Sequence, residues 1–260
     1  MIIYMTKKLC VVFDLDKTIG YFTQIAMLID GIEYHLNRKI TVKEHFKIFD
    51  LFPEIFRPNI FNIFKLLKKS KQKNKHLKVI IYTNNMGPKS WTHIIKKYIE
   101  QKIPKLFDHV ICAWKVGDTL YEPCRTTHNK TYKDLLNCTK FLHYKFCFID
   151  DQYHPHMVHK NIKYLRVIDY KNDLLLENMI QRLYRLHFII NKNTLKPNIL
   201  SSVDNNKYGY KYTRKTTRLY NYSNELFNLI KSFVKINKKK KKTRKYNNRK
   251  YIKLTRKHNN

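Results

Sequence analysis

The stretch Leu-Cys-Val-Val-Phe-Asp-Leu-Asp-Lys-Thr, at residues 9–18, decides how this chain is interpreted. Its first five residues are apolar and rich in Val, Phe and Cys, which predicts a strand that is buried on both faces. Asp14 and Asp16 follow this strand directly. We expect the chain to turn into a loop here, so that the two carboxylates can act together at one site.

Strand-sized apolar runs recur along the chain, with amphipathic stretches of helical length between them. The apolar runs cover residues 9–13, 78–82, 109–113, 146–149 and 164–168, and the amphipathic stretches cover residues 59–70, 88–101, 130–137 and 173–190. Strands that alternate with helices predict an α/β, Rossmann-like fold with a mainly parallel sheet covered on both faces. Open sheets of this type place their ligands beyond the carboxyl ends of the strands.

We expect one domain of this kind over residues 5–195, with a small insertion at residues 19–56 after the first strand. The insertion does not follow the alternation of strands and helices. Asp30-Gly31 within it is a turn signal, which favours a hairpin or a mixed structure. The insertion is too short for a full cap domain, so we expect an open site without a large lid.

The net charge of +34 is spread unevenly along the sequence. Residues 201–260 hold 19 Lys and Arg against 2 Asp and Glu, a net charge of +17. We expect residues 196–260 to form a basic, largely disordered tail, in which only residues 226–234 offer a short amphipathic stretch. Its charge makes nucleic acid a candidate partner through residues 201–260. A merely solubilising tail and an AT-rich genome, which inflates Lys and Asn codons, are alternative explanations.

The composition favours a soluble protein with a real core, because 43% of the residues are hydrophobic. We find neither a signal-peptide-like run after the first Met nor an apolar stretch near the roughly 20 residues that cross a bilayer. We therefore expect an intracellular protein, nuclear or cytoplasmic, that is neither secreted nor membrane-bound. The five cysteines show no Cys-x-x-Cys pairing, and we expect reduced core thiols.

Polar side chains follow three of the expected strands at the point where each strand ends. These clusters are Asp14 with Asp16, Thr83 with Asn84, and Asp150 with Asp151. One acidic residue after a strand is often only a helix cap or a turn residue. Three clusters at one sheet edge, two of them with paired carboxylates, indicate a chemical site instead.

The residue types in these clusters suit phosphoryl transfer. One carboxylate can attack phosphorus while a second gives and later takes a proton at the leaving oxygen. The clustered carboxylates repel a phosphate, and a divalent cation such as Mg²⁺ resolves this repulsion. The site also needs a cation aimed at the phosphoryl oxygens, and a hydroxyl or amide near Thr83 to hold them.

These motifs resemble the signature of the haloacid dehalogenase superfamily of phosphatases. That signature is Asp-x-Asp-x-Thr after an apolar strand, a Ser or Thr after the second strand, a Lys, and an acidic pair after the fourth strand. The matching residues, over about residues 9–170, are Asp14, Asp16, Thr18, Thr83, a lysine before the fourth strand, and Asp150-Asp151. The resemblance implies that Asp14 is the nucleophile and forms an aspartyl-phosphate, and that Asp16 is the acid and base. The implied Mg²⁺ ligands are Asp14, Asp16 through its carbonyl, and the pair Asp150 and Asp151, with Asp151 as the first choice of the pair.

Within this superfamily the chain is similar to the branch that dephosphorylates the carboxy-terminal domain of RNA polymerase II. Arg57-Pro58 matches an Arg-Pro of that branch, and residues 132–135, Tyr-Lys-Asp-Leu, approximate its Tyr-x-Lys-Asp-Leu segment. The similarity makes Lys133 the first choice for the phosphate-binding lysine, with Lys130 and Lys115 as weaker candidates. By the same resemblance Thr18, Asn84 and Arg57 are candidate substrate-binding residues.

The histidines after the acidic pair and the tyrosines of the tail have explanations that need no specific site. His154, His156 and His159 follow the acidic pair, but magnesium prefers oxygen ligands, so we expect histidines of a solvated loop. The tyrosines among the tail's basic residues suit stacking on single-stranded nucleic acid, although composition alone produces such a pattern too.

The expected function is a Mg²⁺-dependent phosphatase that acts through an aspartyl-phosphate, with phosphoserine or phosphothreonine of a protein as substrate. A nucleotide or nucleic-acid-end phosphatase is the second hypothesis. An inactive phosphatase-fold binding module with a nucleic-acid-binding tail is the third, since a fold does not fix a function. The oligomeric state is left open.

Overall fold

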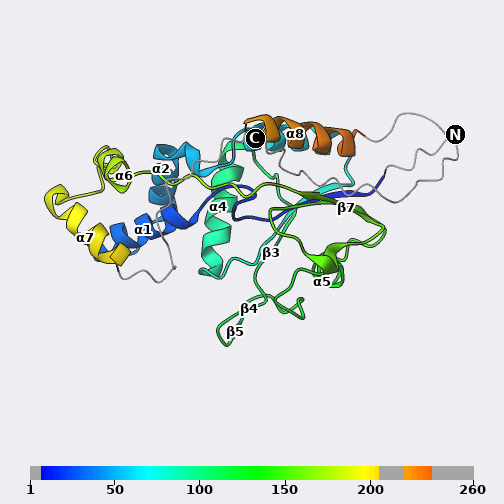
Figure 1. Ribbon diagram of the computed structural model, residues 1–260, viewed down its shortest axis with the longest axis horizontal. Helices are drawn as coiled ribbons and strands as arrows, with labels where there is room; N and C mark the ends of the chain where they lie inside the picture. Colours follow the sequence, from blue (N-terminus) through cyan, green and yellow to red (C-terminus); the bar gives the residue numbers. More distant parts are fainter. Residues whose placement is uncertain (1–6, 205–219, 236–260) are drawn as a thin grey trace, which may run out of the picture.

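The computed structural model describes residues 7–204 and 220–235, and a five-stranded sheet lies at its centre (Figure 1). The strand order is β3-β2-β1-β6-β7, and all neighbouring strands run parallel. The strands are β1 (Leu9–Phe13), β2 (Leu77–Tyr82), β3 (His109–Ile111), β6 (Lys145–Asp150) and β7 (Ile162–Arg166). The predicted α/β fold with a parallel sheet is confirmed, and this arrangement is compatible with a Rossmann-like fold.

The central strand β1 is buried along its whole length, as its apolar sequence predicts. Because successive residues of a strand face opposite sides of the sheet, its side chains are divided between two cores. Val11 and Phe13 belong to the larger core on one face, and Cys10 and Val12 belong to the smaller core on the other. The strand therefore holds the last residues before Asp14 rigidly in the middle of the molecule.

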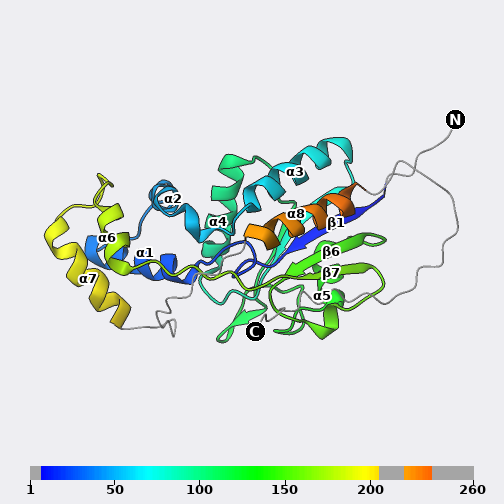
Figure 2. The same ribbon diagram turned by 45° about the horizontal axis from the view of Figure 1, so that its top comes forward.

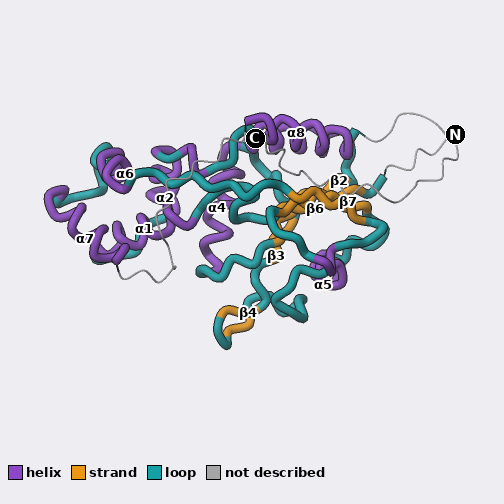
Figure 3. The backbone as a smooth tube through the Cα atoms, viewed as in Figure 1, coloured by secondary structure: helices purple, strands orange, loops and turns teal. Residues whose placement is uncertain are grey.

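Helices cover both faces of the sheet (Figure 2, Figure 3). The larger core includes side chains of α3 (Ile60–Lys73), α4 (Lys89–Lys102) and α8 (Tyr220–Val234), and the smaller core includes Leu135 of α5 (Tyr132–Thr139). A short hairpin of β4 (Lys115–Val116) and β5 (Thr119–Leu120) lies between β3 and α5 in the chain, and two 3₁₀ turns are formed by η1 (Pro53–Ile55) and η2 (Pro155–Met157). The hairpin was not among the sequence-based expectations.

Residues 19–56 form helices, so the hairpin or mixed structure predicted for this insertion is wrong. Its helices α1 (Thr23–Leu36) and α2 (Val42–Leu51) lie together with α6 (Leu176–Leu183) and α7 (Lys192–Asp204), at the left of Figure 1. We call these four helices the helical lobe. Gly31 lies inside α1, where a Cβ would come within 3.1 Å of the Cα of Ile199 in α7. The glycine permits close packing of two helices rather than a turn.

The predicted domain boundary at residue 195 is also wrong. Helix α7 continues across it to Asp204, and α8 belongs to the folded domain, because its Leu226, Ile230 and Phe233 are buried in the larger core. The amphipathic stretch predicted at residues 226–234 is thus part of a helix that packs on the domain. The rest of the predicted disordered tail, residues 205–219 and 236–260, lies outside the described residues.

Two of the five cysteines correct the expectation of reduced thiols. Cys124 and Cys138 form a disulfide that joins the segment after β5 to helix α5, whereas Cys10, Cys112 and Cys147 are free and buried. The two bonded residues are separated by 14 positions and are brought together only by the fold. Among the described helices, none is both long and apolar enough to cross a membrane.

Candidate active site

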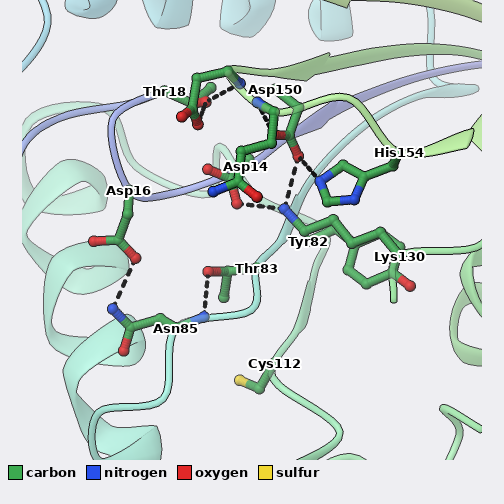
Figure 4. A network of polar contacts seen from close by, with 12 residues as sticks. Asp14, Asp16, Thr18, Tyr82, Thr83, Asn85, Cys112, Lys130, Asp150 and His154 are labelled. Atoms are coloured by element: carbon green, nitrogen blue, oxygen red, sulfur yellow. Dashed lines mark hydrogen bonds and ion pairs between the residues drawn. The ribbon is translucent and has the colours of Figure 1, made fainter. Parts of the chain in front are cut away.

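The carboxyl ends of β1, β2 and β6 meet at one edge of the sheet and bring three of the predicted site residues together (Figure 4). Asp14 follows β1, and its N–H donates to the carbonyl of Ile149 in β6 at 2.9 Å. Thr83 follows β2, and Asp150 is the last residue of β6. All three of these polar residues are buried. A buried polar cluster must satisfy its own hydrogen bonds and charges, and the partners of each group therefore define the site.

Lys130 is the cation at the centre of this cluster. Its Nζ donates to Oδ1 of Asp14 and, at 2.8 Å, to Oδ2 of Asp150. The lysine side chain is only 2% exposed. Burial alone would lower the pKa of Lys130, but the two carboxylates outweigh burial and raise that pKa above its usual range. Lys130 is therefore a fixed positive charge between the ends of β1 and β6.

Lys133, the lysine that the sequence favoured for this position, is not in the cluster. It lies exposed in the first turn of α5. The helix begins after the cap residue Thr131, whose side chain accepts a hydrogen bond from the N–H of Asp134 at 2.9 Å. Lys130 thus precedes the helix and reaches the sheet edge, while Lys133 follows the cap and faces outward. The other alternative, Lys115, starts β4, where its Nζ lies over the ring of Trp114.

The acidic side chains of the site outnumber its cation. Burial raises the pKa of Asp14 well above its usual range, and the neighbouring Asp150 and Asp16 raise it further despite Lys130. Burial also tends to raise the pKa of Asp150, but Lys130 and His154 reverse this and bring it below its usual range. The pKa of Asp151 is raised by burial and by the charge of Asp150. The cluster therefore has an unsatisfied demand for positive charge.

Thr18 holds Asp151 rather than facing a substrate. Its Oγ1 donates to Oδ1 of Asp151 at 3.2 Å and accepts from the N–H of Asp151 at 3.1 Å. Thr18 is 1% exposed, so its hydroxyl is fully occupied inside the protein. These two hydrogen bonds connect the loop after β1 to the loop after β6.

Arg57, a second predicted substrate-binding residue, is also buried and engaged with the backbone. Its Nε donates to the carbonyl of Thr18 at 2.5 Å, and its Nη2 donates to the carbonyls of Lys17 at 2.5 Å and Ile168 at 2.7 Å. Burial lowers the pKa of Arg57 to about 10, which still leaves it charged near neutral pH. Arg57 therefore fixes the loop that follows Asp16, and its guanidinium is too deeply buried to meet a phosphate.

Asp16 lies apart from the Lys130 cluster, because the chain turns after it. Lys17 has a φ of 58°, in the left-handed region, and its N–H donates to the carbonyl of Gly20 at 2.6 Å. One carboxylate oxygen of Asp16 accepts a hydrogen bond from the Asn85 side chain at 2.8 Å (Figure 4). Burial raises the pKa of Asp16, so the group is biased toward its protonated form.

The loop after β2 is organised by Thr83 and Asn85. The hydroxyl of Thr83 accepts from the N–H of Asn85 at 3.0 Å, and the Asn85 side chain accepts from the N–H of Gly87 at 2.9 Å. Asn84, the predicted substrate-binding residue of this loop, is exposed. Sequence reasoning named Asn84 and missed Asn85, although both follow the same strand. The direction in which the turn leaves the strand decides which of the two asparagines reaches the site.

The segment that carries Lys130 is fixed by Arg125, which the sequence analysis also missed. Arg125 is buried, and its guanidinium donates to the carbonyls of Thr83 at 3.2 Å, Cys112 at 2.7 Å and His128 at 3.0 Å. It joins the ends of β2 and β3 to the loop before Lys130. The Cys124–Cys138 disulfide closes the same loop on its other side. No local sequence signal marks a buried arginine of this kind, because its partners are backbone carbonyls, two of them on strand ends that only the fold brings near.

His154 extends the cluster on the β6 side. Its Nε2 lies 3.2 Å from Oδ2 of Asp150, the oxygen that also contacts Lys130. The interpretation of His154 as an ordinary loop histidine therefore needs correction, since it contacts a site carboxylate. The spacing of four residues between Asp150 and His154 was the available sequence signal.

The donor set fits a hard divalent cation. Asp14, Asp150 and Asp151 each offer a carboxylate oxygen, and these oxygens lie within 4.8 Å of one another. Oxygen ligands of this kind suit Mg²⁺ or Ca²⁺ better than they suit zinc or copper. The unsatisfied demand of the cluster for positive charge also favours a bound cation. The side chain of Asp16 is directed to Asn85, whereas the resemblance counts Asp16 among the metal ligands through its carbonyl, which stays a prediction.

Comparison with known proteins does not identify the chain. No protein-family model matches it, and no curated protein matches it.

Proposed function

We propose that this protein is a Mg²⁺-dependent phosphatase that acts through an aspartyl-phosphate on Asp14, as in the haloacid dehalogenase superfamily. The observation that carries the proposal is the position of Lys130, whose Nζ contacts both Asp14 and Asp150 in a buried site. In this proposal, the carboxyl ends of the parallel strands carry a nucleophile, an acid, a fixed cation and a set of metal-binding carboxylates. Ligands of α/β proteins bind at this end of the sheet.

Each residue has a distinct role in this proposal. An oxygen of Asp14 attacks phosphorus, and the bond from phosphorus to the leaving oxygen breaks. Asp16, whose pKa is raised by burial, gives a proton to that leaving oxygen and later takes one from the water that hydrolyses the aspartyl-phosphate. Lys130 neutralises charge on the phosphoryl oxygens, and Thr83 lies beside the same site.

The metal would be held by Asp14, Asp150 and Asp151, the three carboxylates with converging oxygens. When bound, Mg²⁺ would supply the positive charge that lowers the pKa of Asp14 and attracts the phosphoryl group. Thr18 orients Asp151 through its two hydrogen bonds. Arg57 and Arg125 hold the loops that carry Asp16 and Lys130, so they are positioning residues.

The substrate class in this proposal is phosphoserine or phosphothreonine in a protein. Support comes from the resemblance of Arg57-Pro58 and residues 132–135 to the branch that acts on the carboxy-terminal domain of RNA polymerase II. A nucleotide or a phosphorylated nucleic-acid end is the alternative substrate. An inactive binding module is the alternative from another class.

The test is hydrolysis of p-nitrophenyl phosphate by the purified full chain, with Mg²⁺ and with EDTA. Asp14→Asn should lower turnover on the order of 10³-fold or more, because an amide is a poor nucleophile of nearly the same shape. Asp118→Asn is the matched control, since Asp118 is an exposed carboxylate in the β4–β5 hairpin. Equal turnover of Asp14→Asn and the unmodified chain, or equal rates in Mg²⁺ and in EDTA, contradicts the mechanism.

A substrate panel then separates the alternatives. Phosphopeptides, nucleotides and end-phosphorylated oligonucleotides are compared by kcat/KM, with Asp14→Asn as the blank for each substrate. Preference for phosphopeptides supports the protein-phosphatase proposal, and preference for the other two classes supports the second hypothesis. Absence of turnover on every substrate, with Mg²⁺ present, supports an inactive binding module.

A further inference from the structure

Lysines line the edge of the sheet that lies opposite the carboxylate site. The exposed residues Lys8, Lys75, Lys145 and Lys160 each stand within two positions of the start of a strand, at β1, β2, β6 and β7 respectively. We call these four lysines the basic edge. A strand of five residues is about 17 Å long, so the basic edge lies roughly that far from Asp14.

Backbone hydrogen bonds place these lysines side by side. The N–H of Lys145 donates to the carbonyl of Lys8 at 3.0 Å, and the N–H of Leu9 donates to the carbonyl of His76 at 3.3 Å. On the other side of β6, the N–H of Phe146 donates to the carbonyl of Asn161 at 2.8 Å. Neighbouring strands are about 4.8 Å apart, so the four strand starts form a row of about 14 Å.

Helix α3 extends the row. Residues 65–78, which span most of α3 and the start of β2, hold seven lysines and no acidic residue. The neighbouring carboxylate, Asp108, is already paired with Lys71 at 2.7 Å and with Lys78 at 3.3 Å. Asp108 therefore offsets one of the seven lysine charges of residues 65–78, through Lys71 and Lys78 rather than through the four lysines of the basic edge.

The lysines are concentrated here rather than distributed evenly. Residues 19–56, which include two helices of the helical lobe, hold four basic and five acidic residues, a net charge of −1. A codon bias toward lysine acts on the whole chain and would make the lobe basic as well. The contrast between the two regions indicates that the charge of the basic edge has a role of its own.

We propose that the basic edge binds the phosphate backbone of nucleic acid. A row of exposed lysines suits regularly spaced phosphates, which are bound by counterion release. Ten large apolar side chains of the described residues are exposed, and five of them, Tyr34, Val42, Leu175, Ile190 and Leu200, lie on or beside the helical lobe. Near the basic edge, Leu142 precedes β6 and Val158 precedes β7, so the edge presents four lysines beside two apolar side chains. Charge is therefore the larger part of what the edge offers, whereas binding to a membrane surface also uses a broad apolar face.

The basic edge and the acidic cluster lie at opposite ends of the strands. Asp14 follows β1 and Asp150 ends β6, whereas the lysines stand at the strand starts. A bound nucleic acid therefore leaves the candidate active site free for another substrate. This inference does not depend on the proposed phosphatase activity.

The test measures binding of a fluorescent single-stranded DNA of about 20 nucleotides, which is longer than the row of lysines, over a range of salt concentrations. The edge variant carries Lys8→Gln, Lys75→Gln, Lys145→Gln and Lys160→Gln in the full chain. The control, called the lobe variant, removes the same number of charges from exposed lysines in and beside the helical lobe, with Lys39→Gln, Lys43→Gln, Lys47→Gln and Lys196→Gln. Two of these lysines, Lys39 and Lys196, are paired with Glu33 and Glu177. Both variants keep the basic residues of 236–260, so any binding of DNA by those residues is common to both variants.

The edge variant should bind about tenfold or more weakly at about 0.1 M salt, and its salt slope should be smaller by up to about 3, at roughly 0.7 for each phosphate that it no longer neutralises. The lobe variant should stay within about twofold of the unmodified chain, and both should keep its melting temperature. Equal weakening in both variants would mean that only total charge matters and would overturn the proposal. Weakening that is specific to the edge variant on phosphatidylserine vesicles or polyglutamate, but not on DNA, would overturn it in favour of that partner.

Discussion

Thr18 and Asp151 exchange two hydrogen bonds across the sheet edge, although 133 positions separate them in the chain. The hydroxyl of Thr18 both donates to the carboxylate of Asp151 and accepts from its N–H, so one side chain fixes the rotamer and the backbone of the other. The pair connects the loop after β1 to the loop after β6. In the proposed site, this contact determines where the Asp151 carboxylate meets a metal ion.

We predict that Thr18→Val weakens Mg²⁺ binding about 10- to 100-fold, as removal of groups that orient metal ligands commonly does. The change keeps the shape of the side chain but leaves the buried N–H of Asp151 without a partner, at a cost of about 1–3 kcal/mol in stability. The measurement is the Mg²⁺ dependence of the melting temperature, which needs no enzymatic activity. Thr18→Ser retains the hydroxyl and should remain close to the unmodified chain. Equal Mg²⁺ affinity of the Val and Ser variants would show that Thr18 does not orient the site.

Lys130 and Lys133 provide a second test, because they are close in sequence but differ in burial. Lys130→Met removes the cation that contacts Asp14 and Asp150, so we expect a loss of about 3–5 kcal/mol in stability from the uncompensated carboxylates. Turnover should fall by about 10²-fold or more. Lys133→Met changes an exposed residue and should alter neither quantity. Chemical denaturation and steady-state kinetics of both variants test the assignment of Lys130 as the lysine of the site. Losses in Lys133→Met but not in Lys130→Met would assign that role to Lys133 instead.

Truncation tests the corrected domain boundary. Removing residues 236–260 takes away 12 Lys and Arg but none of the described side chains, so the melting temperature and small-substrate turnover should be unchanged. Removing residues 220–260 also removes Leu226, Ile230 and Phe233, which are buried in the larger core. At about 1.5–3 kcal/mol for each buried side chain, the loss of about 5–9 kcal/mol approaches the whole stability of a typical domain. A stable chain that ends at residue 219 would show that α8 is dispensable.

The disulfide should stabilise the loop that carries Lys130. Its closed loop spans 14 positions, for which loss of the cross-link costs about 3 kcal/mol in the chain-entropy model. Adding a thiol reductant should therefore lower the melting temperature of the unmodified chain. The Cys124→Ser, Cys138→Ser double variant should melt at that lower temperature with or without reductant. An unmodified chain whose melting temperature ignores reductant would show that the cross-link does not contribute.

The sequence alone was sufficient to predict β1 and the carboxylates at its end, since residues 9–13 are apolar without interruption and Asp14 follows directly. The same local reasoning predicted the other four sheet strands, and it predicted that the polar clusters after β1, β2 and β6 meet at one edge. Buried strands and amphipathic helices are determined largely by the spacing of apolar residues within a short segment, and that spacing is visible in any single sequence.

The tertiary structure alone decided which residues complete the site and where the domain ends. Asp30-Gly31 is a turn signal, and nothing in the local sequence reveals that Ile199 packs against Gly31. Arg57 was expected to bind substrate from the family resemblance. The local sequence does not reveal its backbone partners, the carbonyls of Thr18 and Lys17, because they lie about 40 positions away. The choice between Lys130 and Lys133 depended on where the cap at Thr131 starts α5. Each of these outcomes depends on how segments pack against one another, and that packing forms only when the sheet brings them together.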